Sequence, residues 1–489
     1  MATEPQQYDE VLANADLVPT EGEGRTWNWY NYLAVWMGMI HNIFNYSVAA
    51  GLLVLGMNAW QALLTILVGN TVLLVVVALN GELGQRYGTP FPVIVRASFG
   101  VFGANVAALI RALVAIGWFG IQGYLGATAL SALVGAVAPG WNHFNVHIPL
   151  IGLPINLLAA IIVYWILFGF IVLHGMEAVK RFENWAGPLV LVLMLFLFFW
   201  ALSAAHGLGP IFSQPGKLHG VAFWGPFFAG VASIVSSFAT LGLNIPDFTR
   251  FSRSRRDQLI GHIFGLPLTQ LFFAFLAVSI TSATVVVYHQ AIWDPVTLIQ
   301  KFHSPVIVIL GTLILMIATL SINVAANIVS PAYDLSNLVA KHINFRLGAL
   351  ITLIVAFVYM PWRLLVNAST IYTILGASGA AIAPATAIMM VDFWLIRRQH
   401  IDKHQLYLTR GIYRFQGGWN WRALVALAVG LFLSGAGVVW NAFAGLYKES
   451  WFVGFFAAGI LYWIFGALFP YTQSAMEPSG SVAQSESST

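Results

Sequence analysis

Apolar runs about 20 residues long recur along almost the whole chain, and this feature most constrains its fold. Of 489 residues, 59% are hydrophobic and 8% are charged, whereas a soluble domain carries about 25% charged residues. A helix of about 20 apolar residues spans a bilayer and satisfies its own backbone hydrogen bonds there. The sequence therefore predicts an all-α polytopic membrane protein.

Twelve apolar segments lie within residues 27–470, and we predict that each crosses the membrane as a helix. Polar tails at 1–26 and 471–489 flank this membrane domain, and we predict that both are disordered and cytoplasmic. The predicted helices cover residues 28–54, 58–79, 99–136, 150–173, 185–206, 225–244, 260–289, 304–329, 347–361, 369–396, 422–442 and 451–470.

The distribution of basic residues sets the orientation of these segments. With the N-terminus inside, 17 of the 22 Lys and Arg residues lie on the cytoplasmic side. Four lie outside, and one, Arg111, lies within a predicted helix. We therefore predict a multi-pass protein of the cell (inner) membrane with both termini in the cytoplasm. The net charge of +4 reflects this topology and gives no reason to expect a nucleic-acid partner.

The polar groups deep in the predicted helices are mostly neutral. Every Asp and Glu lies in a tail, in a loop or at a helix end, whereas carriers of charged solutes keep ionisable groups at depth. Arg111 lies towards a cytoplasmic end, so we expect it to snorkel. An uncharged substrate with amide-like edges fits these mostly neutral polar groups. The deep polar residues are Asn42, Asn45, Gln122, Ser233, Ser236, Ser237, Thr240, Thr319, Ser321, Asn323, Asn327 and, as the one group that titrates near neutral pH, His41.

No group of residues is spaced for catalysis. The chain has no cysteine, which excludes a disulfide, a thiolate nucleophile and a Cys-based metal site. Nucleophiles, metal ligands and acid–base pairs at catalytic spacing are also missing from the sequence. We therefore expect no enzymatic activity and no cofactor.

Trp118 and Gln122 form the most informative pair within an apolar segment. Residues four apart project from the same side of a helix, so an aromatic surface lies one turn from a primary amide. An amide offers two donors and an acceptor, so the pair is able to stack on a small planar molecule and hydrogen-bond it. The alternative is that both side chains pack against a neighbouring helix.

Two segments carry polar and small residues where a helix could be interrupted. The first contains Gly38, His41, Asn42 and Asn45, and residues 229–244 repeat the pattern with glycines and serines. The two segments hold equivalent places if helices 1–5 and 6–10 form two repeats. Interrupted helices at matching positions indicate a transporter site, because unwound backbone frees carbonyls for a cation. The alternative is that small residues only let helices pack closely.

Six phrases of the sequence carry a resemblance to a known family. They are WMGMIHN (36–42), NGELGQRYGTPFPVIVRASFG (80–100), WFGIQ (118–122), LNIPDFTRFSR (243–253), SINVAANIVSPAYD (321–334) and VDFWLIRR (391–398). On these phrases the chain resembles nucleobase:cation symporter family 1, which includes hydantoin, allantoin, uracil and cytosine permeases. The resemblance covers residues 26–470. It implies the leucine-transporter-like fold, with ten helices in two inverted five-helix repeats, helices 1 and 6 discontinuous, and two peripheral helices. We expect a monomer.

The same resemblance implies a substrate site. It makes Trp118 a stacking platform and Gln122 a hydrogen-bonding partner, with Asn327 as a second amide and Asn42 as a further polar contact. Phe238 stands where the family commonly has a second Trp. A phenyl ring still stacks, but it has less area and no N–H donor. Ser237 stands where the hydantoin carrier has Gly, so it supplies a hydroxyl or narrows the pocket.

A cation site is also implied by the resemblance. Gly38 and His41 would supply carbonyls from helix 1, and Ala318 and Ser321 would contribute oxygens from helix 8. Sodium users in the family show a second hydroxyl where this chain has Ile322, which removes one ligand from a possible sodium site. Sodium coupling and proton coupling, the latter involving His41, both stay open. Phe44 is a further departure, since many relatives carry Pro there.

The predicted function is secondary active import of a small neutral nucleobase-like heterocycle, of the allantoin, uracil, hydantoin or cytosine class. We expect alternating access with symport of a proton or a sodium ion. The alternative is a non-transporting membrane receptor or a channel on the same scaffold. The polar groups concentrate at one depth beside two predicted helix breaks, whereas a channel would favour a continuous polar path.

Overall fold

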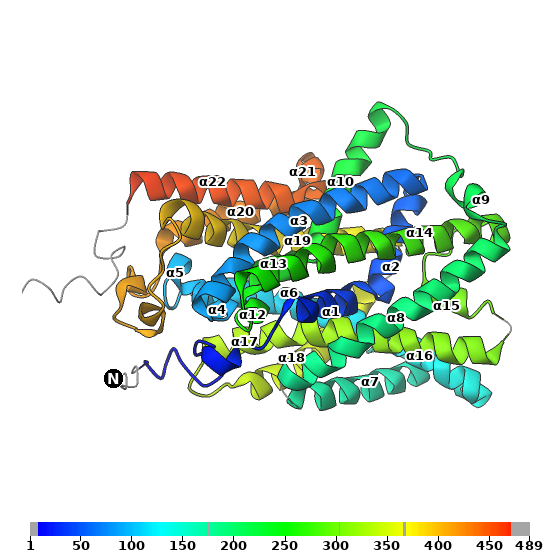
Figure 1. Ribbon diagram of the computed structural model, residues 1–489, viewed down its shortest axis with the longest axis horizontal. Helices are drawn as coiled ribbons and strands as arrows, with labels where there is room; N and C mark the ends of the chain where they lie inside the picture. The colour runs from blue at the N-terminus through cyan, green and yellow to red at the C-terminus, as the bar shows by residue number, and fades with distance from the viewer. Residues whose placement is uncertain (1–7, 175, 303, 365–367, 471–489) are drawn as a thin grey trace, which may run out of the picture.

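The computed structural model describes residues 8–174, 176–302, 304–364 and 368–470. Most helices lie side by side along the long axis of the molecule (Figure 1). In the described chain, the only sheet is a small antiparallel hairpin of β1 (His147–Ile148) and β2 (Leu153–Pro154). The predicted all-α class is therefore confirmed.

Eight helical segments of the described chain are long and apolar enough to cross a membrane. They are α3 (Ala59–Tyr87), α6 (Ala104–Val137), the later part of α8 (Met176–Ala204), α13 (Arg255–Ile263) with η3 (Phe264–Leu268) and α14 (Thr269–Tyr288), α16 (Pro305–Ile322) with η4 (Asn323–Ile328) and α17 (Val329–Leu338), α19 (Ala368–Val391) with η6 (Asp392–Ile396), α20 (Trp421–Val439) and α22 (Ser450–Leu468). The chain is therefore a multi-pass membrane protein.

A bent pair of helices and three shorter apolar helices complete this set. The pair is α1 (Trp29–Ile40) with α2 (Ile43–Val54), and the shorter helices are α7 (Ile155–Leu173), α10 (Val221–Ser237) and α18 (Phe345–Tyr359). Each of the twelve predicted segments overlaps one of these helices. The number of crossings stays a prediction, because Ile155–Ile171 of α7, α10 and α18 are apolar stretches of only 10–17 residues.

Short elements connect these helices. They are η1 (Gly22–Gly24), α4 (Phe91–Ile94), α5 (Arg96–Phe99), η2 (Pro139–Phe144), α9 (Leu208–Phe212), α11 (Ala239–Asn244), α12 (Pro246–Thr249), α15 (Pro295–Ile299), η5 (Pro361–Leu364), η7 (His404–Tyr407), η8 (Ile412–Arg414), η9 (Asn441–Phe443) and α21 (Ala444–Lys448).

The first apolar segment breaks at His41 and Asn42, where α1 and α2 meet at an angle of 62°. Asn42 has an extended backbone, and its Oδ1 accepts from the Asn45 N–H at 3.0 Å. Its Nδ2 donates to the Met39 carbonyl at 2.6 Å, and Asn45 Nδ2 donates to the Ile40 carbonyl at 2.9 Å. Two amide side chains therefore satisfy backbone groups that the break would leave unpaired.

The second polar segment is also interrupted. Helix α10 ends at Ser237, Phe238 leaves the helical conformation with φ −122° and ψ 21°, and α11 begins at Ala239. The predicted segment 225–244 is therefore divided at Phe238. Both interruptions lie beside α6, which packs against α2 and against α11.

The N-terminal segment packs against the loops at one end of the bundle (Figure 1). Leu17 is fully buried, and the Tyr407 hydroxyl donates to its carbonyl at 2.7 Å. Asn14 Nδ2 donates to Ser336 Oγ at 2.8 Å. The prediction of a disordered tail is therefore wrong for residues 8–26, because a few leucines and amides anchor an otherwise polar segment. Residues 1–7 and 471–489 of the two predicted tails lie outside the described residues.

Candidate functional site

A small cavity, which we call the closed cavity because it is too small for a heterocycle, lies where α2, α6, the break after α10 and η4 meet. Its volume is about 20 Å³, which is room for about one water molecule. Five of the predicted substrate residues line it together, namely Trp118, Gln122, Ser237, Phe238 and Asn327. The structure therefore brings these five side chains from three separate segments to one cavity.

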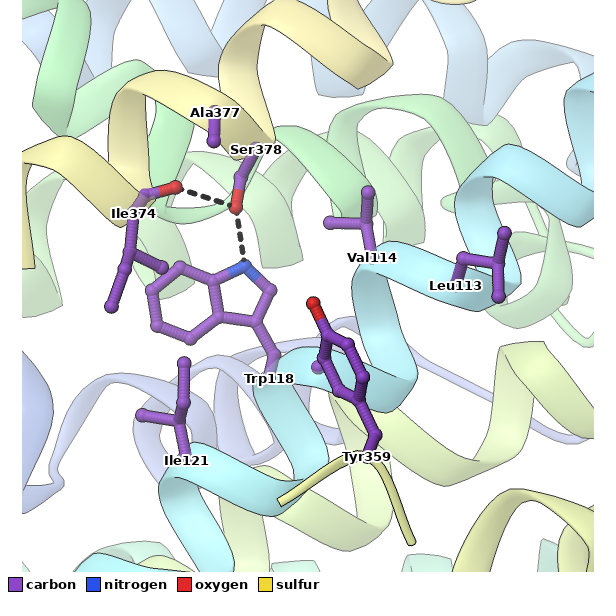
Figure 2. Close-up of a pocket in the computed structure, with 9 residues that line it drawn as sticks. Leu113, Val114, Trp118, Ile121, Tyr359, Ile374, Ala377 and Ser378 are labelled. Carbon is purple, nitrogen blue, oxygen red and sulfur yellow. Dashed lines mark hydrogen bonds between the residues drawn. The ribbon is translucent and has the colours of Figure 1, made fainter. Parts of the chain in front are cut away.

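Trp118 is held in place by a helix distant in the sequence. Its indole Nε1 donates to Ser378 Oγ on α19 at 2.8 Å, and Ser378 Oγ donates to the Ile374 carbonyl at 3.0 Å (Figure 2). The ring of Phe44 packs edge-on against the indole, with centroids 4.8 Å apart. Since the single N–H of Trp118 is bound to α19, the indole presents only its aromatic surfaces to other groups.

A second cavity lies on another side of the same indole. Its volume is about 250 Å³, and Leu113, Tyr359 and Ala377 are among its lining residues (Figure 2). Leu113 and Tyr359 are both more than half exposed, so this cavity opens at the outer surface of the helix bundle. The indole of Trp118 lines both cavities and lies between the closed cavity and that surface.

Gln122 follows Trp118 by one turn of α6 and carries an unsatisfied acceptor. The residue is 2% exposed, and its Oε1 has no hydrogen-bond partner in the part of the chain that the structure describes. A buried polar atom without a partner costs about 1–3 kcal/mol. A ligand N–H in the closed cavity would remove that cost.

Asn327 lies in η4, a turn of π-helix that joins α16 to α17. Its Nδ2 donates to Asn323 Oδ1 at 2.7 Å, and Asn323 Nδ2 donates to the Phe119 carbonyl on α6 at 3.0 Å. Single π-helical turns of this kind are frequent at functional sites. The two amides form a chain that fixes Asn327 beside the cavity.

Phe238 and Ser237 reach the cavity from the break after α10. Phe238 is 2% exposed, and its ring packs edge-on against Trp36 with centroids 5.7 Å apart. The Ser237 hydroxyl donates to the Ile234 carbonyl at 2.6 Å, so its proton is used within the helix. Phe238 therefore contributes an aromatic surface, and Ser237 contributes mainly its oxygen atom.

One predicted contact is not at the cavity. Asn42 does not line it, because both ends of its amide are bound to backbone groups of the helix break. Asn45, one turn further, lines the cavity in its place. Residue type alone does not separate the two, because asparagine serves equally well as a helix cap and as a ligand contact. Phe44, Thr240 and Ile322 also line the cavity and were not predicted as substrate contacts.

The residues predicted to hold a cation are all buried, and the two helices that carry or precede them, α1 and α16, pack against each other. His41, Ala318 and Ser321 have no exposed surface, and Gly38 is buried in the last turn of α1. Carbonyls in the last turn of a helix lack intrahelical partners and are available as ligands. Ile322 faces the substrate cavity with an apolar side chain. Among the described residues, no group of three His, Asp or Glu is placed to hold a metal ion.

Arg111 does not snorkel, so that prediction is wrong. It is fully buried, and its guanidinium donates to Asn244 Oδ1 and to the Ala326 carbonyl, each at 3.0 Å. The carboxylate of Asp334 lies 3.9 Å from the same guanidinium. Asp334 was predicted to lie outside the membrane-spanning helices, but α16 continues through η4 into α17, which ends at Leu338. A buried acidic residue is therefore present after all.

This charge cluster joins three segments just beyond the cavity. Asn244 Nδ2 donates to Asp247 Oδ2 at 3.1 Å, and Asp247 Oδ1 accepts from the Phe91 N–H at 2.7 Å. Asp247 lies in α12, beyond the apolar helix α10. Burial raises the pKa of Asp247, while Ser330 and Arg111 oppose that increase. Helices α6, α12 and α17 are thus tied together by hydrogen bonds between buried polar groups.

Comparison with known proteins gives a consistent picture. Residues 18–454 match the family described as permeases for cytosine/purines, uracil, thiamine and allantoin. The chain is 42% identical to the allantoin permease of Bacillus subtilis, over 97% of each protein. It is 34% identical to the purine-uracil permease NCS1 of Arabidopsis thaliana, over 97% of this chain and 81% of that protein.

Two solved transporter structures share the fold of this chain. Mhp1, a nucleobase-cation-symport-1 family transporter, in a closed conformation with bromovinylhydantoin bound, superposes with a TM-score of 0.78 at 25% identity, covering 95% of this chain and 98% of that one. A Na⁺-coupled sialic acid symporter shares the fold, with a TM-score of 0.60 at 15% identity over 92% of each chain. The predicted leucine-transporter-like fold is confirmed. The chain is a transporter that belongs to the nucleobase:cation symporter family, among the permeases for cytosine, purines, uracil, thiamine and allantoin.

Proposed function

We propose that this transporter imports a small neutral heterocycle with amide edges, of the allantoin, uracil, hydantoin or cytosine class, by alternating access with symport of a cation. The observation that carries the proposal is the unpaired, buried Oε1 of Gln122 beside the indole of Trp118. An N–H group on a flat molecule would donate to the Gln122 oxygen, and the face of the same molecule would stack on the Trp118 indole. The 42% identical relative is an allantoin permease, which makes allantoin the first compound to test.

Each site residue has a role in this proposal. Trp118 provides the stacking surface, Phe238 the second aromatic contact, and Gln122 and Asn327 read the polar edge of the substrate. Ser237 shapes the wall beside Phe238. Since the cavity of about 20 Å³ is too small for a heterocycle, substrate entry requires these segments to separate.

The coupling cation is either a proton or a sodium ion, bound between α1 and α16. Gly38 and His41 would contribute carbonyls, and Ala318 and Ser321 the remaining oxygens. The side chain of Ile322 offers no hydroxyl oxygen, so sodium would have fewer ligands than its dehydration calls for. Proton coupling involving His41 is the slightly favoured form of the proposal.

We further propose that the protein works as a monomer in the cell (inner) membrane, with both termini in the cytoplasm. The excess of Lys and Arg on one side supports this orientation. The N-terminal segment and the loop after α19 meet at one end of the molecule, as one cytoplasmic face requires (Figure 1).

Uptake of labelled allantoin, uracil, hydantoin and cytosine by whole cells tests the proposal. A coupled carrier accumulates one of these compounds above its external concentration, and collapse of the ion gradient abolishes that accumulation. Equilibration without accumulation would indicate a channel on the same scaffold. Binding of a compound without uptake would indicate a receptor.

A further inference from the structure

A third cavity lies directly beyond the substrate cavity, at the other end of the bundle from the N-terminus. Its volume is about 330 Å³, and residues of α2, α6, α19 and the loop element α15 line it. Figure 1 shows α15 at the end of the molecule opposite the N-terminal segment. In the orientation proposed above, this cavity faces the outside of the cell.

The outer cavity and the closed substrate cavity share one residue. Phe44 lines both of them and is 3% exposed. Its ring packs edge-on against the indole of Trp118. Phe44 therefore separates the two spaces, and it stands in the part of the chain where α2 follows the helix break.

The outer cavity offers the same kinds of group as the substrate cavity. It presents the indole of Trp293, the phenol of Tyr124 and the side-chain amide of Gln300. Its one carboxylate, Asp294, caps α15 by accepting from the Val296 and Thr297 N–H groups at 3.2 and 3.0 Å. That carboxylate already accepts these two hydrogen bonds. The polar groups of the cavity that remain for a ligand, the phenol of Tyr124, the indole N–H of Trp293 and the amide of Gln300, are neutral.

The two cavities differ in size in this conformation. The substrate cavity holds about one water, whereas 330 Å³ falls within the range of about 300–1,000 Å³ typical of ligand pockets. A heterocycle that arrives from outside therefore finds room beside Trp293 and Gln300 while the inner site is still closed.

We propose that the outer cavity is a second binding site for the same neutral heterocycle, occupied before Phe44 moves aside. This inference rests on the proposed function, since it assigns the same class of substrate to a new place. The aromatic ring of Trp293 stacks on the substrate, and Gln300 hydrogen-bonds its amide edge. The substrate that reaches the inner site has then already been recognised by Trp293 and Gln300.

Cysteine labelling tests this site, because the chain contains no cysteine of its own. Thr297→Cys places one thiol at an exposed position of the cavity wall. A membrane-impermeant maleimide added to intact cells should label it. Allantoin at about nine times its dissociation constant should slow that labelling about tenfold, since a tenth of the sites stay empty. Asn145→Cys, exposed after η2 and outside the cavity lining, is the unprotected control.

The decisive comparison adds Gln122→Ala to remove the inner site. Protection of Thr297→Cys that persists in this background supports an independent outer site, and Gln300→Ala should then abolish it. Loss of protection with Gln122→Ala would overturn the proposal, because protection would then report closure of the inner site. Failure of the maleimide to reach Thr297→Cys would overturn it too, because the cavity would not open outward.

Failure of this inference is distinguishable from failure of the proposed function. Uracil, hydantoin and cytosine are tested as protecting compounds alongside allantoin. Accumulation of one of the four by unmodified cells, without protection of Thr297→Cys by that compound, removes the outer site and leaves the transport function intact. If cells accumulate none of them, the proposed function fails, and the outer site fails with it.

Discussion

Gln122→Met is the sharpest test of the substrate site. Methionine keeps the length and most of the volume of glutamine but removes the acceptor that has no partner in the closed cavity. The structure therefore predicts two effects of opposite sign. Substrate binding loses a hydrogen bond, while the empty protein loses an unsatisfied buried group.

The size of each effect follows from the burial of Gln122, which is 2% exposed. A substrate N–H left without its acceptor costs about 1–3 kcal/mol, which corresponds to about 5- to 150-fold weaker binding. The empty protein should be as stable as the original or more stable by up to about 1 kcal/mol, because an apolar group of similar shape replaces an unpaired polar one.

Initial uptake rates over a range of substrate concentrations measure the first effect, and thermal unfolding of the purified protein measures the second. Gln270→Met is the matched control, because Gln270 is also 2% exposed with an unpaired Oε1 but lies in α14, away from the cavity lining. It should show the same change in stability and unchanged uptake. Normal uptake by well-expressed Gln122→Met or Gln122→Ala would refute the assignment.

Four further changes test the surrounding structure. Ser378→Ala leaves the Trp118 indole N–H unpaired and should raise the KM for uptake about 5-fold or more, whereas Ser378→Thr should restore it; unchanged kinetics in both would show that this bond does not position the ring. Phe238→Trp should change the substrate preference in competition assays more than the thermal stability, and the reverse pattern would make Phe238 a packing residue. Ile322→Thr should increase the dependence of uptake on sodium, measured with choline replacement and a protonophore; strict sodium dependence of the unmodified protein would refute proton coupling. Arg111→Met should destabilise the protein by about 3–5 kcal/mol, because it leaves a buried carboxylate unpaired, and adding Asp334→Leu should recover part of that loss in thermal unfolding.

The apolar segments were predictable because length and hydropathy follow directly from the bilayer. Their ends were not, and the segment 304–329 shows why. Ser330, Pro331 and Asp334 resemble a helix end, yet the helix continues through the π-helical turn η4 to Leu338, and the Arg111 guanidinium faces the Asp334 carboxylate there. That partner lies more than 200 residues away in the sequence, so no local pattern predicts it.

Side-chain chemistry and helical spacing together predicted that Trp118 and Gln122 lie at one place, and both line the same cavity; their contact with a substrate stays a prediction. Ser378, the acceptor for the indole, lies 260 residues from Trp118 and has no distinguishing local pattern. Asn42 was predicted as a substrate contact, but its amide binds backbone groups of the helix break and does not line the cavity, because an amide suits either role. Tertiary contacts decide such cases, and they are not readable from a single segment.

Helix α19 connects the substrate cavity to the rest of the transporter. Its Ser378 accepts the indole N–H of Trp118 on α6, and the hydroxyl of its Tyr372 donates to the Val48 carbonyl on α2 at 3.0 Å. Movement of α19 away from both helices therefore breaks two hydrogen bonds, at a combined cost of roughly 1–3 kcal/mol. A substrate hydrogen bond to Gln122 is worth a similar amount, so binding at that residue is able to offset the opening or closing of α19. The closed cavity thus lies beside the indole whose hydrogen bond ties α6 to α19, so a ligand that contacts Trp118 and Gln122 is placed to influence that contact.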